Sequence, residues 1–388
     1  MEKKIMNKAV DFDKVRKRRQ RAVTLKRLLL LTGAMILAGS AVFVYNVLVE
    51  ESATTGLMDY FESRGGTGFP VDLPGGVIRD VVSIGENLAV LNDTNLIIYN
   101  KNGKIIQNIQ RMTEHSIAET SHARVLAFSV GGRNFSVHSI SREMFSQSLD
   151  QGILCGDMGA NGDFAVVAPA QHFASRVTVY DRQFRQIYSW SSPEYVTNVS
   201  LSPRGDMMAV SCVTGGETGV MKSLIYLFRF AEDRDQAEVA LTLEDSLCLG
   251  LDFMESDRIA LFTDKEYMIL NQQGEIKETY DFGSRRLLAR ENSGRWTLLF
   301  FERPGRYETE LVLLDESLKE TASMAIHERI FDVAFGKDVI YLLTEDGITG
   351  YDHQMQQVLA YERHGISRIH LIGTRLYYLT YSQICVLG

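Results

Sequence analysis

The sequence is poor in the residues that build metal centres and disulfide scaffolds. Its four cysteines form no CxxC pair, and its eight histidines are scattered without a regular spacing. Structural zinc sites need such ligands at short, fixed intervals, and disulfide scaffolds are much shorter, cysteine-rich chains. We therefore predict no metal site and expect the cysteines to be small buried side chains within apolar runs. They are Cys155, Cys212, Cys248 and Cys385.

The chain also has little basic charge beyond its first 27 residues. Residues 1–27 contain 11 Lys and Arg against three acidic residues, a net charge of +8. The whole chain has 41 basic and 49 acidic residues, so the remainder has 30 and 46, a net charge of −16. An acidic bulk argues against a nucleic-acid partner, whose phosphates require a basic surface. Two segments of such opposite charge are expected in different compartments.

One long apolar run separates these two segments. Leu28–Val49 has 22 residues without a charge, which as a helix spans about 33 Å against a hydrocarbon core of about 30 Å. The alternative is a cleaved signal peptide, but the apolar run continues for eight residues beyond the small residues Ala38–Ala41. Basic residues precede the run, and Glu50 and Glu51 follow it. The positive-inside rule therefore predicts a single-pass cell-membrane protein with a cytoplasmic tail, residues 1–27, and an extracytoplasmic C-terminal domain.

Beyond the apolar run the sequence lacks any long amphipathic helix. Residues 50–66 are expected to form a polar connector with one or two helical turns. After them, short alternating apolar runs are broken by Gly, Asn, Asp and Pro, a pattern that predicts many short antiparallel strands. The sequence thus predicts an all-β domain over residues 67–388.

One hairpin recurs within this domain. An apolar strand ends in Asn or Asp, a turn follows, and a mixed strand returns. Asn and Asp suit this corner because they hydrogen-bond to the local backbone and tolerate left-handed geometry. The corner residues are Asn100, Asp181, Asn271, Asp315 and Asp352. Their separations of 81, 90, 44 and 37 residues, with degenerate copies in the two long gaps, give a period of about 40 residues.

A period of about 40 residues with four short strands per copy is typical of a β-propeller. Eight copies, each a four-stranded antiparallel sheet, are counted from residue 76 to the C-terminus, and seven is the alternative count because two copies are degenerate. The last copy contains only three strands. We therefore expect residues 68–73 to supply its fourth strand and close the ring, which removes exposed sheet edges.

The turn from Ser202 to Asp206 resembles the Ser-Pro-Asp-Gly turn of WD40-type and TolB-type propellers. The resemblance concerns architecture alone, since Trp190 and Trp296 are not followed by Asp. The complete layout of basic tail, apolar anchor, acidic connector and degenerate propeller also resembles a bacterial family known as domain of unknown function 5711. That resemblance implies a membrane-anchored propeller and carries no activity.

Motifs of catalytic propellers are absent from the sequence. It has no GxSxG elbow, no phosphate-binding loop, no Ser-x-Asp-x-Gly-x-Thr-Trp box, and too few tryptophans for the repeats of quinone-dependent dehydrogenases. We assign no catalytic residue and no cofactor. Asn198, Asp332 and Arg368 occupy comparable places on the expected innermost strands. They are the candidates for binding a ligand at the central channel.

The favoured hypothesis is a non-catalytic binding or scaffold module for a protein or cell-envelope ligand. One alternative is a ligand sensor that relays binding to a cytoplasmic partner through the basic tail. The other is an enzyme that acts on envelope glycan or peptide with carboxylates from several blades, because a propeller fold alone does not decide between binding and catalysis.

Overall fold

The computed structural model describes residues 32, 33, 35, 51–110, 112–215, 220–230, 239–254, 258–303 and 308–387. It divides into two compact units, Met1–Phe61 and Glu62–Gly388. Most of the predicted transmembrane segment, and all of the basic tail, lie outside the described residues. In the part of the chain that is described, no helix is long and apolar enough to cross a membrane.

The connector contains more helix than the sequence analysis expected. Helix α2 (Glu51–Glu62) has 12 residues, about three turns rather than one or two. Its sequence contains no proline and only one glycine, Gly56, so nothing interrupts the helix before Glu62.

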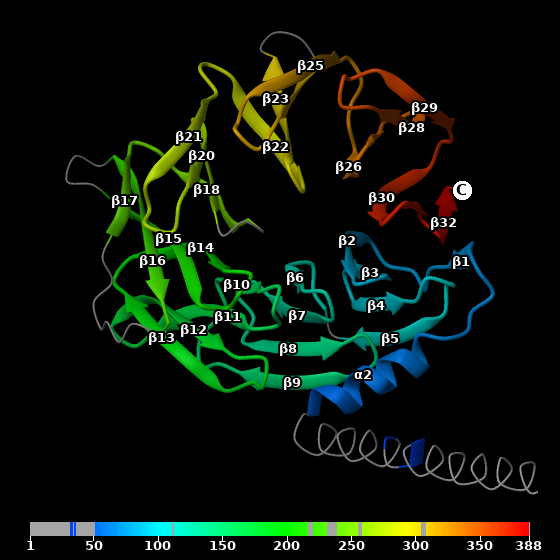
Figure 1. The fold of residues 1–388 in the computed structure, drawn as a ribbon, viewed down its shortest axis with the longest axis horizontal. Helices are drawn as coiled ribbons and strands as arrows, with labels where there is room; N and C mark the ends of the chain where they lie inside the picture. The colour runs from blue at the N-terminus through cyan, green and yellow to red at the C-terminus, as the bar shows by residue number, and fades with distance from the viewer. Residues whose placement is uncertain are drawn as a thin grey trace, which may run out of the picture. The chain divides into compact units, whose positions relative to one another are not determined.

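The second unit is a ring of eight antiparallel sheets, each with four strands (Figure 1). This confirms the predicted propeller and the count of eight blades. In seven blades the four strands follow one another in sequence, and the first strand of each lies nearest the ring axis (Figure 1).

The first four blades cover residues 78–244. Their strands are β2 (Ile78–Ile84), β3 (Asn87–Asn92), β4 (Asn95–Tyr99), β5 (Ile105–Gln110); β6 (Ser116–Thr120), β7 (Arg124–Ser129), β8 (Asn134–Ser139), β9 (Glu143–Ser148); β10 (Cys155–Met158), β11 (Phe164–Ala170), β12 (Phe173–Tyr180), β13 (Gln186–Ser192); and β14 (Tyr195–Leu201), β15 (Met207–Gly215), β16 (Met221–Arg229), β17 (Val239–Glu244).

The last four blades cover residues 248–387. Their strands are β18 (Cys248–Phe253), β19 (Ile259–Thr263), β20 (Glu266–Leu270), β21 (Ile276–Asp281); β22 (Arg286–Ser293), β23 (Trp296–Arg303), β24 (Glu308–Leu314), β25 (Glu320–Ile326); β26 (Asp332–Phe335), β27 (Ile340–Leu343), β28 (Gly347–Tyr351), β29 (Gln357–Glu362); and β30 (Ile366–Ile372), β31 (Arg375–Thr380), β32 (Gln383–Leu387).

A strand from the start of the propeller completes the eighth blade. Strand β1 (Val71–Asp72) pairs antiparallel with β32, Val71 opposite Ile384 and Asp72 opposite Gln383. Residues 68–73 were expected at this position from the sequence. A hydrogen bond from the Leu73 amide to the Ser382 carbonyl (2.8 Å) continues the pairing. The two ends of the propeller thereby hold one sheet together, so the ring has no open edge at this blade.

All five corner residues make the same pair of hydrogen bonds. The side-chain oxygen of Asn100, for example, accepts from the amides of Asn102 and Lys104, both at 2.9 Å. Asp181, Asn271, Asp315 and Asp352 bond their own second and fourth following amides in the same way. The side-chain bonding expected of the corner is confirmed.

The left-handed residue of each corner lies three positions later, not at the Asn or Asp. These residues are Gly103, Phe184, Gly274, Leu318 and Met355, with φ between 56° and 81°. Three of them carry large apolar side chains that pack into the core. Burial of these side chains offsets the cost of a left-handed backbone for a residue other than glycine.

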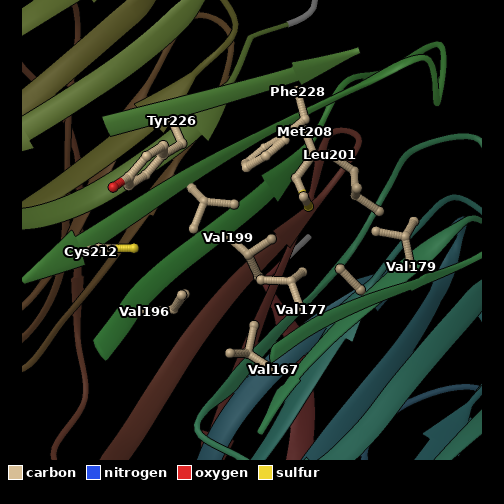
Figure 2. Packing of buried hydrophobic residues seen from close by; sticks show 12 residues of the cluster. Val167, Val177, Val179, Val196, Val199, Leu201, Met208, Cys212, Tyr226 and Phe228 are labelled. Carbon is tan, nitrogen blue, oxygen red and sulfur yellow. The ribbon is translucent and has the colours of Figure 1, made fainter. Parts of the chain in front are cut away.

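The core lies between neighbouring blades, not at the ring axis. Valines of blade 3, such as Val177, face Val199 and Met208 of blade 4 across a fully apolar interface (Figure 2). Similar clusters join the other neighbouring blades, and one joins blade 8 to blade 1 through Tyr377 and Tyr99. Alternate residues of each strand supply these contacts because side chains of a strand alternate between the two faces of its sheet.

Candidate functional site

The strand order gives the propeller two different faces. We call one side the corner face. It holds the turns between strands 1 and 2 and between strands 3 and 4 of each blade, including the five corner residues. We call the opposite side the loop face, and it holds the connections between strands 2 and 3 and those between one blade and the next. The inner strands begin at the loop face.

Exposed apolar side chains gather on the loop face. Among the described residues of the propeller, 14 large hydrophobic side chains are exposed, and ten of them lie in loop-face connections or at the strand ends beside them. These ten are Val77, Val130, Phe173, Tyr195, Val220, Met221, Leu249, Leu288, Phe331 and Tyr381. The other four, Ile105, Ile187, Ile276 and Val358, lie on outermost strands at the ends beside the corner face. A concentration of this kind marks an interaction surface.

Half of the loop-face group lies where inner strands begin, around the ring axis. This rim consists of Val77, Tyr195, Leu249, Leu288 and Phe331, from blades 1, 4, 5, 6 and 7. Leu249 and Leu288 each occupy a bulge in the pairing of the first two strands of their blade. A β-bulge re-aims the side chain of its extra residue, and both leucines are about half exposed, at 49% and 50%.

The corner face is instead used to join blades. An arginine at the start of a second strand donates to a backbone carbonyl in the 3–4 turn of the following blade. Arg124 donates to the Arg182 carbonyl (2.7 Å), Arg258 to that of Glu316 (3.2 Å), and Arg375 to that of Lys101 (3.2 Å). The last of these bonds connects blade 8 to blade 1. Charge-assisted bonds from a planar guanidinium suit such a bridge.

A pocket of about 580 Å³ opens on the loop face between blades 7, 8 and 1. Val77, Phe331 and Tyr381 form apolar parts of its wall, and Arg363 and Arg368 form charged parts. Tyr381 is 84% exposed. Arg363 is fixed by a hydrogen bond of 2.6 Å to the hydroxyl of Tyr378, so the pocket combines aromatic surface with guanidinium groups.

Six carboxylates lie on the inner strands around the axis. They are Asp80, Glu119, Asp157, Asp252, Glu291 and Asp332, on β2, β6, β10, β18, β22 and β26. Asp80 and Glu291 are exposed, whereas the other four are half-buried. Solvent therefore reaches the centre of the ring at this level.

These carboxylates raise one another's pKa values. Burial raises the pKa of Glu119 to about 7, and the negative charges of Asp157, Asp252 and Asp80 add to the rise. The pKa of Glu291 also rises to about 7, because the surrounding protein displaces water from its carboxyl although the residue as a whole is exposed, and the charge of Asp332 contributes. The pKa of Asp157 rises to about 6 for the same reason, despite the hydrogen bond that it accepts from Leu201. The carboxylates thus lie close enough to interact across the axis.

Some of these carboxylates also connect neighbouring blades. Asp157 accepts a hydrogen bond from the Leu201 amide (2.7 Å) of blade 4, and Asp332 accepts one from the Ile369 amide (2.8 Å) of blade 8. Asp252 forms an ion pair with Arg290 of blade 6 at 2.6 Å. The guanidinium of Arg290 also stacks over Phe262, 3.9 Å from the ring centroid. Three of the six carboxylates are therefore hydrogen-bonded or paired with groups of the next blade.

The described residues were compared with the requirements of a metal centre and of a reactive thiol. Among the residues it describes, no group of three or more His, Cys, Asp and Glu is arranged to hold a metal ion. All four cysteines are free; Cys212, Cys248 and Cys385 are buried, and Cys155 is half-buried. Burial raises the pKa of Cys155 and of Cys212 to about 12, which suppresses the reactive thiolate.

Comparison with known protein families identifies the family of the chain. The model of the family of unknown function DUF5711 matches residues 76–383, the propeller almost from end to end. The chain belongs to this family. The resemblance found in the layout of the sequence is thereby confirmed at the level of the family, and no curated protein matches the chain.

Solved structures share the fold of this DUF5711 protein at very low sequence identity. Sqt1 of Saccharomyces cerevisiae is 8% identical, covers 84% of this chain and 100% of its own, and superposes with a TM-score of 0.59. BamB of Moraxella catarrhalis is 10% identical, covers 83% and 99%, and has a TM-score of 0.52. At these identities the likeness establishes the propeller fold alone.

The three residues predicted to face the channel of this DUF5711 protein lie on inner strands, at equivalent positions of β14, β26 and β30. Asp332 and Arg368 are brought together, since the charge of Arg368 lowers the pKa of Asp332 against the effect of burial. Asn198 lies in blade 4, on the other side of the ring, and donates to the Ser211 hydroxyl at 3.0 Å. The three residues therefore do not form one site.

Sequence reasoning missed five of the six inner-strand carboxylates. Of the six, only Asp332 was singled out. The signal was present, because Asp80, Asp252 and Glu291 also follow the start of an inner strand and interrupt its apolar pattern. Which of these side chains approach one another depends on the order of the blades around the ring.

Proposed function

We propose that this protein is a membrane-anchored, extracytoplasmic β-propeller that binds a protein or cell-envelope ligand through its loop face, without catalysing a reaction. The observation that supports this most strongly is the concentration of ten exposed apolar side chains on that face. Exposed apolar side chains that gather on one face mark a site of interaction with another molecule. The corner face, in contrast, uses its polar groups within the propeller.

The anchor is the second part of the proposal. Leu28–Val49 spans the cell membrane once, residues 1–27 stay in the cytoplasm, and the propeller lies outside. Alkaline phosphatase, which folds only outside the cytoplasm of bacteria, fused after residue 387 is expected to be active in membrane fractions that resist carbonate extraction. Activity in the soluble fraction, or an inactive fusion, would overturn the topology.

Binding by the loop face is tested with paired variants of the full-length protein. Leu249→Asn combined with Leu288→Asn changes the rim, whereas Ile187→Asn combined with Ile276→Asn changes exposed apolar residues of outer strands. Affinity capture from crosslinked membranes is expected to lose its main partner with the first pair and to keep it with the second. Equal recovery with both pairs would contradict the proposal.

The inner-strand carboxylates favour one second candidate, an enzyme that acts on envelope glycan or peptide. Glu119 and Glu291, with pKa values of about 7, have the proton affinity expected of a general acid near neutral pH. Release of sugars or peptides from purified cell-envelope material by the wild type, abolished by Glu119→Gln or Glu291→Gln, would support catalysis. No release by the wild type would exclude it.

A further inference from the structure

We propose that the partner of the loop face is a protein segment that inserts a lysine or arginine side chain into the centre of the ring, while apolar residues beside that side chain pack on the rim. This inference rests on the proposed function, and it adds the chemistry of the partner. It follows from two properties that meet at the same opening: an apolar rim and an acidic wall.

The first argument is the balance of charge around the axis. Six carboxylates lie on the inner strands, and two guanidinium groups, those of Arg290 and Arg368, interact with them. When the carboxylates are ionised, their six charges exceed these two guanidinium groups by four. Arg79 and Arg286, on the same strands, pair instead with Glu114 and Glu302. Burial is the main cause of the raised pKa values of Glu119 and Glu291, and the neighbouring negative charges add to the rise. A cation brought to the axis lowers the repulsion among these charges, whereas an anion increases it.

Second, Glu119 and Glu291 differ from the three carboxylates that are bonded to a neighbouring blade. Asp157 and Asp332 accept backbone hydrogen bonds from the next blade, and Asp252 is paired with Arg290. For Glu119, the largest influences on the pKa are burial and neighbouring negative charges, with no cation among them. Glu291 is exposed to solvent, and its nearest cationic influence is Arg290, which is already paired with Asp252. These two glutamates, together with the exposed Asp80, are therefore the carboxylates available to an incoming cation.

The third argument concerns the shape of the partner. The rim residues Tyr195, Leu249, Leu288, Phe331 and Val77 lie at the beginnings of inner strands, so apolar side chains from five of the eight blades lie beside the way to the carboxylates. Lysine and arginine have long apolar stems that contact such a rim while the charged end reaches further in. A small inorganic cation would leave the rim uncovered. An amphipathic protein segment satisfies both parts.

The test is selection of a random peptide library on the full-length protein in detergent micelles. Enriched peptides are expected to contain Lys or Arg flanked by apolar residues, with the basic residue required for binding. The double variant Glu119→Gln and Glu291→Gln should weaken these peptides at least tenfold. The matched pair Glu278→Gln and Glu316→Gln, on an outer strand and on the corner face, should leave affinity unchanged. Raising salt from 50 to 300 mM should also weaken binding, because screening reduces the attraction.

The outcomes separate this inference from the proposed function. Peptides that lose binding to the Leu249→Asn and Leu288→Asn pair, but lack a required basic residue, would overturn the inference and leave loop-face binding standing. Peptides insensitive to that pair would contradict both. A selection that yields no binder dependent on the rim would likewise count against both.

Discussion

The two faces of the propeller differ in how their side chains are used. The corner face is polar, yet its polar groups are engaged within the protein: corner residues bond their own turns, and Arg124, Arg258 and Arg375 join one blade to the next. The loop face exposes apolar side chains with no such internal use. Polarity alone would have pointed to the wrong face. The better guide is which groups remain without a partner after the fold is complete.

This difference has a physical origin in the repeat. Each blade needs a tight turn between strands 3 and 4, and the Asx-type bonds of the corner residues stabilise that turn in five blades. Connections on the loop face vary more in length, and a side chain that bonds its own turn begins three of them, at Asn92, Thr263 and Thr380. They are therefore free to carry side chains chosen for binding, as loops on a rigid scaffold commonly are.

The largest loss of stability is expected from adding a side chain to a tightly packed turn of the corner face. Gly103 has φ of +78°, and a Cβ there would lie 2.5 Å from Val71 Cγ1 and 3.0 Å from the Gly68 carbonyl oxygen. Gly103→Ala should lower the free energy of unfolding by about 3 kcal/mol, the sum of left-handed strain and overpacking. Gly131 on the loop face has the same φ, but a Cβ there would meet nothing within 4 Å.

Gly131→Ala is therefore the matched control, with an expected loss of about 1 kcal/mol from strain alone. Denaturant unfolding of the two full-length variants provides both values. Equal losses would mean that the corner face is not the tightly packed side of the ring.

The next largest loss of stability is expected from removing arginines that donate to a carbonyl of the following blade. Replacing Arg258 and Arg375 together with alanine should lower the free energy of unfolding by about 2 kcal/mol, since each removes a charge-assisted hydrogen bond between blades and the two sites are far enough apart to add. Arg286, at the loop-face end of β22, forms an exposed ion pair with Glu302 at 3.2 Å. Arg286→Ala should cost less than about 0.5 kcal/mol. A larger loss at Arg286 than at the two bridges would reverse the comparison.

A smaller and pH-dependent effect is expected at the axis. Because the pKa of Glu119 is about 7 in the folded protein and 4.5 in its ordinary state, the folded state binds this proton more tightly. The ionised carboxylate thus destabilises the fold as pH rises through 4.5 to 7. Glu119→Gln should raise the free energy of unfolding at pH 8 by about 1 kcal/mol, because solvent reduces an upper limit of about 3 kcal/mol.

At pH 4.5 the same substitution should have almost no effect, since the wild-type side chain is then largely protonated in the native state. Glu278→Gln, on the outer strand β21, serves as the control and should show no such dependence on pH. A benefit of Glu119→Gln that is larger at low pH than at high pH would contradict the repulsion inferred at the axis.

The smallest effect on stability is expected at the rim. Leu249→Asn and Leu288→Asn alter side chains that are half exposed and located at bulges, so the midpoint of thermal unfolding should change by less than about 2 °C. The same two substitutions should nevertheless abolish binding of the loop-face partner. Destabilisation comparable to that of Gly103→Ala would mean that these leucines are part of the fold, not of a binding surface.

The sequence was sufficient to predict the architecture because residues close together in the chain mark each repeat. Asn100, Asp181 and their equivalents mark the same turn in each blade, and the three-stranded last copy indicated that a strand near Val71 would be needed. The length of α2 was underestimated, since its ordinary helix formers have no distinctive pattern. The apolar anchor at Leu28–Val49 remains a prediction.

The candidate site was much less accessible from the sequence. Asp332 and Arg368 are near each other because blades 7 and 8 are neighbours, whereas Glu119 and Asp252 interact across the ring, far apart in the chain. No local pattern encodes that approach. The exposure of Leu249 and Leu288 depends on bulges that a single sequence does not reveal. Alternation alone would have placed Leu249 with Leu251 and Phe253 on an apolar side of β18.

The most direct measurement is a map of photo-crosslinking over both faces of the full-length protein in its native membrane. A photoreactive amino acid placed at Leu249, Leu288 or Tyr381 should crosslink to one common partner. The same amino acid at Lys101, Gln273 or Ser317, on the corner face, should yield no crosslink to it. Crosslinks to that partner from the corner face, with none from the loop face, would contradict the account.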